Sequence, residues 1–163
     1  MEKPWQQYYS EAAIQFDAAK VEAQTLSALA TKAVNKYGQK PAFTTALPNG
    51  AQTTISYTQL GLYSDYLAIY FREVLGLKTG DTIAVLAPNC IGLCVASIAI
   101  AKAGCIGSNI NPLYTASELE HQLSDSQATT LVIIDLFADK LDQVIDNTQL
   151  KHVVTLSLLE FFP

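Results

Sequence analysis

The sequence predicts an α/β fold with a mostly parallel sheet, flanking helices and a small N-terminal β-hairpin. Residues 82–89 form a short apolar run stopped by a proline, as in a strand buried on both faces. Residues 90–103 are apolar nearly all round, which indicates a buried helix, and Gly104 is placed to end it. Residues 104–112 form a second short strand. Strand, helix and strand make a βαβ unit, which implies a parallel sheet with right-handed crossovers.

The first quarter of the chain is expected to hold an arm and a helix. Residues 1–24 form an N-terminal arm, and its aromatic residues, such as Trp5 and Tyr8, suggest that it packs on something. From Thr25 the apolar residues recur at helical spacing, with Thr25 as the cap and Gly38 at the end. That helical stripe consists of Leu26, Leu29, Ala30, Ala33, Val34 and Tyr37.

The hairpin and a second helix follow. Residues 41–47 and 51–55 are predicted strands around an Asn-Gly turn, the strongest short hairpin signal. Ser56 leads into an amphipathic helix that ends before Gly76. Residues 77–81 then turn the chain into the central βαβ unit.

The last third continues the α/β alternation. Thr115 and Glu118 have capping-box spacing and open a helix over residues 116–124. Residues 128–134 and 152–157 are predicted as further strands, joined by an amphipathic helix. The apolar residues of that helix are Leu136, Phe137, Leu141, Val144 and Ile145. We interpret residues 25–163 as an incomplete α/β subdomain, and the ending Phe-Phe-Pro163 suggests a cut chain.

Composition restricts the functional classes. The 163 residues suit one domain, and only 15% are charged, against about a quarter in ordinary domains. We therefore expect a large core or an apolar surface that meets a partner. The net charge of −5 argues against nucleic acid as a partner, because binding it needs a basic surface. The carboxylates gathered late in the chain are interpreted as solvated helix faces.

The chain lacks the usual marks of export and membrane insertion. Residues 1–10 contain no apolar signal-peptide core, and the most apolar stretch, 90–101, is shorter than the roughly 20 residues that span a bilayer. Three cysteines without framework spacing indicate a reducing compartment. We predict a cytoplasmic protein and leave peripheral attachment to the inner membrane face open.

Each candidate for chemistry has a simpler structural interpretation. Cys90, Cys94 and Cys105 supply three thiols, but they lie among aliphatic residues, where cysteine packs as a small hydrophobe. Lys78-Thr79-Gly80 lacks the Ser-x-x-Lys partner of serine-acylating enzymes and is interpreted as a turn. Gly104-x-x-Gly107 precedes a strand and is not a dinucleotide fingerprint.

Four further positions were weighed. His121 and His152 have no triad-like context, and we interpret them as solvated or capping residues. Asp135 ends a strand at the carboxyl edge of the sheet, where ligands bind in open α/β folds, but helix capping is favoured. Residues 87–89 open a helix at the same edge without the glycines of a phosphate loop. The sequence therefore predicts no catalytic, cofactor-binding or metal-binding residue in this chain.

Four motifs in order resemble the N-terminal part of the adenylate-forming superfamily. Ile55-Ser-Tyr57-Thr58-Gln-Leu60 is similar to its first core motif, and Leu77-x-x-Gly80-Asp81-x-Ile83-Ala84 to its turn into a strand. Ala101-Lys102-Ala103-Gly104 through Asn111-Pro112 is similar to the second core motif. The stretch from Asn111 to Ser126, with Tyr114, Thr115, Glu118, His121 and Gln122, is most similar to long-chain fatty acyl-CoA synthetases. The resemblance runs from about Thr25 to His152.

The resemblance implies an AMP-forming long-chain fatty acid–CoA ligase that uses ATP, magnesium and CoA. In that family ATP and a fatty acid give an acyl-adenylate and pyrophosphate, and CoA then takes the acyl group. The family's phosphate loop, its adenine and ribose segments and its catalytic lysine have no counterpart here. The motifs present are structural, so no catalytic role passes to Tyr57, Gly104 or Asn111.

The fragment alone is therefore expected to be inactive, to hold no cofactor and to need the remainder of its chain as partner. A different interpretation remains open, a self-contained flavodoxin-like module that binds a small ligand or a protein without catalysis. An incomplete sheet also leaves an unpaired edge or an apolar face, which favours homodimers.

Overall fold

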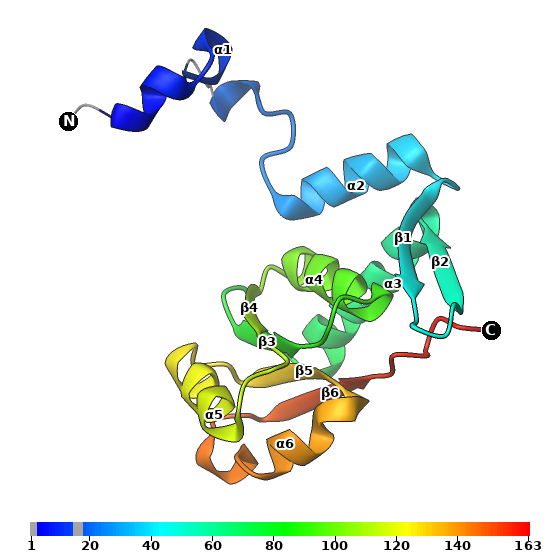
Figure 1. Ribbon diagram of the computed structural model, residues 1–163, viewed down its shortest axis with the longest axis vertical. Coiled ribbons are helices and arrows are strands. Elements are labelled where there is room, and N and C mark those ends of the chain that lie inside the picture. The colour runs from blue at the N-terminus through cyan, green and yellow to red at the C-terminus, as the bar shows by residue number, and fades with distance from the viewer. Residues whose placement is uncertain (1–2, 15–17) are drawn as a thin grey trace.

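The computed structural model describes residues 3–14 and 18–163, and it divides them into an N-terminal arm and an α/β body (Figure 1). The arm contains η1 (Pro4–Tyr8), α1 (Glu11–Ile14) and η2 (Ala18–Lys20). Its aromatic side chains do not pack as expected. Trp5 is 53% exposed and Tyr8 is 82% exposed, and Figure 1 shows the arm extending away from the body.

The first long helix lies on the surface of the body. Helix α2 (Leu26–Tyr37) starts where Thr25 Oγ1 accepts the amide of Ala28 at 3.0 Å, which confirms the predicted cap. Its apolar stripe is wider than the surface that it covers. Val34 packs against Gly61 of the next helix, α3 (Tyr57–Ile69), where a Cβ on the glycine would lie 3.0 Å from the valine side chain. Leu26 and Leu29 stay 72% and 53% exposed, so part of the predicted apolar stripe is uncovered.

The hairpin and the next helix follow the predicted order. Strands β1 (Pro41–Ala46) and β2 (Gln52–Ser56) pair antiparallel. Helix α3 (Tyr57–Ile69) begins with a capping box between Ser56 and Gln59, and its last part, η3 (Tyr70–Val74), is π-helical. Gly76, at φ 69°, ends this stretch as predicted.

Four parallel strands form the central sheet in the order β4-β3-β5-β6. They are β3 (Thr82–Leu86), β4 (Ile106–Ile110), β5 (Thr130–Ile134) and β6 (His152–Leu156). Strands β3 and β5 occupy the centre, and β5 is buried along its whole length. This explains their continuous apolar runs, because a central parallel strand has helices on both faces. Strand β4 lies at an edge, and Ile106 there is 56% exposed.

The helices cover the two faces of the sheet. Helices α3 and α4 (Ile91–Ala103) lie on one face, where Phe71, Ala99 and Val132 share a core. Helices α5 (Ala116–Asp125) and α6 (Ala138–Asp142) lie on the other, where Leu119, Ile133 and Leu141 share a second core (Figure 1). The predicted cap of α5 is confirmed, because Thr115 and Glu118 form a complete capping box.

The last predicted helix is wrong in its extent. Residues 135–147 form three short pieces, η4 (Asp135–Phe137), α6 and η5 (Ile145–Asn147). Leu141 and Val144 are buried, whereas Leu136 is 66% exposed and Ile145 is 37% exposed. Phe137 packs against the core only partly buried, so three side chains support this segment, and a short helix with so little packing is marginal. Within the described residues no helix is long and apolar enough to cross a bilayer.

Candidate functional site

The carboxyl edge of the parallel sheet is the candidate site, because ligands bind at this edge in open α/β folds. The chain passes along it after each strand, at residues 87–90, 111–115, 135–137 and 157–163. Strand β3 leads to β4 on one side and, by the next crossover, to β5 on the other. The direction of winding thus reverses after β4, which places the switch point between the neighbouring strands β3 and β5, the kind of position where a crevice forms.

The N-terminus of α4 is already satisfied by the hairpin. Cys90, the N-cap residue, makes no side-chain cap. Instead, the amide of Ile91 donates to Thr45 Oγ1 at 2.9 Å, and Thr45 is only 6% exposed. A hydroxyl from β1 therefore occupies the place that a phosphate would take at a helix N-terminus. Residues 87–90 also contain no glycine, so the groups present here do not fit the phosphates of ATP.

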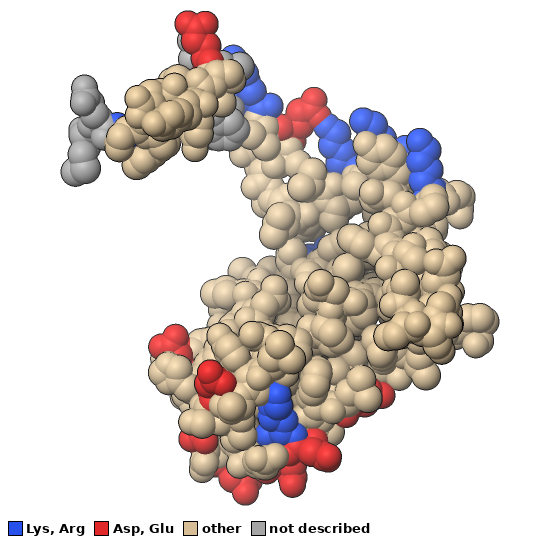
Figure 2. All heavy atoms as spheres, viewed as in Figure 1, with Lys and Arg blue, Asp and Glu red and all other residues tan. Residues whose placement is uncertain are grey.

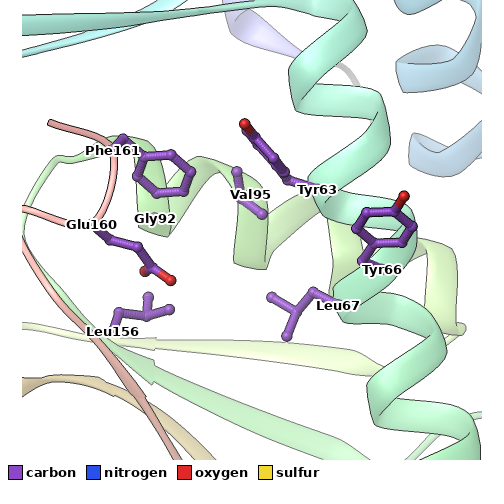
Figure 3. Close-up of a pocket in the computed structure, with 8 residues that line it drawn as sticks. All are labelled: Tyr63, Tyr66, Leu67, Gly92, Val95, Leu156, Glu160 and Phe161. Carbon is purple, nitrogen blue, oxygen red and sulfur yellow. The ribbon is translucent and has the colours of Figure 1, made fainter. Parts of the chain in front are cut away.

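A cavity of about 440 Å³ opens at the same edge, between α3, the start of α4 and the C-terminal segment (Figure 3). Its lining residues are Tyr63, Tyr66, Leu67, Gly92, Val95, Leu156, Glu160 and Phe161. The rings of Tyr63 and Phe161 are in contact at a tilt of 52°, with centroids 5.6 Å apart. Thr53 Oγ1 donates to the Phe161 carbonyl at 2.6 Å, which fastens the C-terminal segment to the hairpin.

The cavity has binding character and no evident reaction centre. Leu67, Val95 and Leu156 make its floor apolar, and Figure 3 shows the Glu160 carboxylate directed over that floor. Its eight lining residues include no histidine, cysteine or lysine. The cavity therefore offers an apolar surface beside one carboxylate, without a nucleophile or a base paired to one.

The three cysteines lie where packing was predicted. Cys90 is buried, while Cys94 and Cys105 are half-buried. Burial raises the pKa of the Cys94 thiol, and the nearby Cys90 adds a smaller increase. Burial, and next the Asp81 carboxylate, raises the pKa of the Cys105 thiol, which Arg72 partly offsets. Both thiols therefore stay protonated at neutral pH, the wrong form for a nucleophile or a metal ligand. Within the described residues no group of three potential ligands could hold a metal ion.

The predicted turns lie at the opposite, amino edge of the sheet. In Lys78-Thr79-Gly80 the Lys78 amide donates to Asp81 Oδ2 at 2.7 Å, so the interpretation as a turn is confirmed. Gly104 is left-handed at φ 72° and ends α4 as predicted. A hydrogen bond joins the two turns, because the Gly80 amide donates to the Gly104 carbonyl at 2.9 Å.

The remaining candidates are scattered. His121 is exposed on α5, and His152 starts β6 at the amino edge. Asp135 is exposed in the first turn of η4, whose N-cap is Ile134, so its predicted capping role is wrong. At the carboxyl edge Lys140 Nζ donates to the Pro112 carbonyl at 2.8 Å and ties α6 to the end of β4.

Two structural contacts near the site are not predicted from the sequence. Thr45 is one, and nothing in its strand pattern distinguishes it. Lys102 is the other. It is the one charged residue of α4, and its Nζ lies 2.7 Å from Asp65 Oδ1 and 2.9 Å from Ser64 Oγ on α3. A single lysine in an otherwise apolar helix was a usable signal, because a buried charge needs a partner.

Comparison with known proteins identifies the family. The family model described as AMP-binding enzyme matches residues 30–162. The chain belongs to this family. It is 39% identical over 131 residues to the long-chain-fatty-acid–CoA ligase of Escherichia coli O6:H1. The matched region covers 80% of this chain and 22% of that relative. It is 35% identical over 155 residues to the ligase of the same name from Yersinia pestis, covering 94% and 26%.

Solved structures show the same fold. A long-chain-fatty-acid–CoA ligase from Archaeoglobus fulgidus matches 84% of this chain and 29% of its own, with a TM-score of 0.74 at 25% identity. An anthranilate CoA ligase in complex with anthranoyl-AMP matches 86% and 27%, with a TM-score of 0.77 at 19% identity. The chain thus spans between a fifth and a third of the length of these proteins.

Proposed function

We propose that this chain is the N-terminal part of an AMP-forming long-chain fatty acid–CoA ligase. The proposed reaction joins ATP and a fatty acid into an acyl-adenylate with release of pyrophosphate, and CoA then displaces AMP to give acyl-CoA. One observation carries the proposal. The curated relatives that share 35 to 39% identity over most of this chain bear the name of that ligase.

The proposal assigns this chain the role of scaffold. Residues 1–24 are the arm, and residues 25–163 are an incomplete α/β subdomain that the remainder of the protein completes. ATP, magnesium and CoA would bind residues outside this chain, since the α4 N-terminus is occupied by Thr45 and the cavity lacks reactive groups. We assign no catalytic, cofactor or metal ligand to the described residues.

The reading frame and an activity assay test the proposal together. The gene is sequenced downstream of Pro163, and the whole encoded protein is assayed with ATP, oleate and CoA for acyl-CoA and AMP. We expect a frame that continues into a Ser/Thr/Gly-rich loop and a protein that forms acyl-CoA, whereas residues 1–163 form none. A stop codon directly after Pro163, or acyl-CoA formed by residues 1–163 alone, overturns it.

The flavodoxin-like alternative is not favoured. The strand order β4-β3-β5-β6 is compatible with such a module, but the family match and the named relatives point to a ligase. We further propose that the protein is cytoplasmic, attaches peripherally to the inner membrane face and does not bind nucleic acid. Self-association through the uncovered β4 or β6 edge is the remaining proposal, because unpaired edges pair readily.

A further inference from the structure

An exposed apolar groove edged by lysines lies along α2 and the segment that leads into it. We call residues 18–40 the α2 surface. The groove has a volume of about 500 Å³, and its lining includes Lys20, Val21, Leu29, Lys32, Lys36 and Tyr37. Leu29, Lys32 and Lys36 follow at intervals of three and four residues, which places them on one face of the helix. Apolar and basic groups thus share one exposed surface.

The body covers only part of this surface, at Val34 and at Tyr37, whose ring centroid lies 5.1 Å from that of Tyr57. Helix α2 packs on the body through Val34 and Gly61, and none of its residues is buried. Leu26, Leu29 and Val21 are 72%, 53% and 40% exposed. Large apolar side chains gathered on one surface mark an interaction site more often than single exposed ones do. The α2 surface therefore has the composition of a docking face.

Charge is distributed unevenly between the two ends of the molecule. The α2 surface contains four lysines and one carboxylate, Glu22, which pairs with Lys32. Residues 116–147, which carry α5 and α6, contain seven carboxylates and one lysine. Figure 2 shows the lysines along α2 at one end and the acidic residues at the opposite end. Such a distribution turns the basic end toward a negatively charged surface.

An anionic lipid bilayer satisfies both properties at once. Lipid headgroups attract lysines near the surface, and the acyl boundary accepts the leucine and valine side chains between them. Lys36 and Lys40 lie 5.4 and 5.7 Å from the centroid of the Tyr37 ring, and tyrosine is favoured at the level of the headgroups. The arm just before this surface adds Trp5, an interfacial residue type that is 53% exposed here.

We propose that the α2 surface lies flat on a bilayer that contains anionic lipids, with the α5–α6 end turned away from it. This specifies the face and the lipid charge of the membrane attachment proposed above. It depends on surface chemistry alone, so a chain that proves to have no part in a ligase would leave it standing.

Flotation of the 163-residue chain with lipid vesicles tests the proposal. Vesicles of phosphatidylcholine with phosphatidylglycerol are compared with vesicles of phosphatidylcholine alone. The variant is Lys36→Gln with Lys40→Gln, and its matched control is Lys78→Gln with Lys151→Gln. Both remove two exposed lysines, so the net charge is the same. We expect the unsubstituted chain to bind only the anionic vesicles. Each α2 lysine removed should weaken that binding about fivefold, so the Lys36→Gln, Lys40→Gln variant should bind about 30-fold more weakly. The control variant should bind about as well as the unsubstituted chain.

A second pair tests the apolar contribution. Leu29→Gln is compared with Leu62→Gln, since both leucines are about half exposed and neither belongs to the buried core. We expect several-fold weaker binding for the α2 variant and no change for the α3 variant. Equal binding to neutral vesicles, or equal loss from both lysine pairs, overturns the proposal. Sedimentation without lipid gives a further refuting result. If the chain associates with itself and the Lys36→Gln, Lys40→Gln variant does not, then the α2 surface binds the acidic end of a second copy and not a membrane.

Discussion

Replacing Thr45 with valine tests the contact that fastens the hairpin to the sheet. Valine keeps the shape and the β-branch but removes the oxygen that accepts the Ile91 amide at 2.9 Å. Thr45 is 6% exposed, and Cys90 offers no replacement cap, so the amide at the start of α4 would lose its partner in a place that excludes water. A buried donor left without a partner costs about 1–3 kcal/mol, and we expect about 2 kcal/mol, or about a 30-fold smaller folding constant.

Urea denaturation and amide exchange measure this loss. Thr44→Val is the matched control. Its hydroxyl lies 2.7 Å from that of Thr54 on the exposed side of the hairpin, where water can replace the contact, so we expect a change of less than about 0.5 kcal/mol. Thr45→Ser restores the acceptor and should recover most of the loss. Faster exchange of the Ile91 amide should accompany the valine variant. Equal stability of the two valine variants would refute the reasoning, because the buried hydrogen bond would then contribute nothing.

Three further outcomes are expected. Gly104→Ala should lower stability by about 1–2 kcal/mol for the left-handed backbone alone, and by more because its Cβ would lie 3.2 Å from a threonine hydroxyl. Gly76→Ala is the control, because Gly76 has a similar φ of 69° but no atom near its Cβ position, so it loses only the backbone contribution. If both alanine variants lose equal stability in denaturation, the steric contribution at Gly104 is contradicted. Thr130→Val should raise stability by about 1 kcal/mol, since the buried Thr130 hydroxyl has no partner in the described structure, and a lower urea midpoint contradicts this. Hydrogen bonds from the Thr115 amide and, next, from the Thr115 hydroxyl lower the pKa of Glu118. The contact therefore contributes its full stability at pH values above the ordinary glutamate pKa. That contribution is lost as the pH falls through the lowered pKa of the folded state. NMR titration should show that Thr115→Val reduces the lowering without removing it, because the larger contribution comes from the backbone.

Much of the fold could be predicted because its signals are local. The capping box at Thr115 and the left-handed stop at Gly104 depend on groups within a few residues of each other. The central strands were equally clear, since burial on both faces requires an unbroken apolar run such as Thr130–Ile134. These elements needed no knowledge of their neighbours.

The features that the sequence does not determine depend on what packs against each element. Helix α2 has an apolar stripe wider than the part of α3 that it contacts, and no periodicity shows which half is covered. Residues 135–147 have helical spacing, but only Leu141 and Val144 are buried in the core, and Phe137 packs against it partly exposed. The contacts of the candidate site join still more distant positions. Thr45 and Ile91 are 46 residues apart, and Thr53 and Phe161 are 108 apart.

The motifs that identify the family are a separate matter from the chemistry of its site. The turn at Gly80 and Asp81 and the turn at Gly104 meet at the amino edge, where the Ile106 amide also donates to the Asp81 carbonyl at 2.9 Å. Together these bonds set the register in which β3 and β4 begin. Ligands of open α/β sheets bind at the other edge, where this chain presents the Thr45 cap and an apolar cavity. The recognisable residues therefore specify how the sheet is assembled, and under the proposed function residues outside this chain would bring the reactive groups to the carboxyl edge.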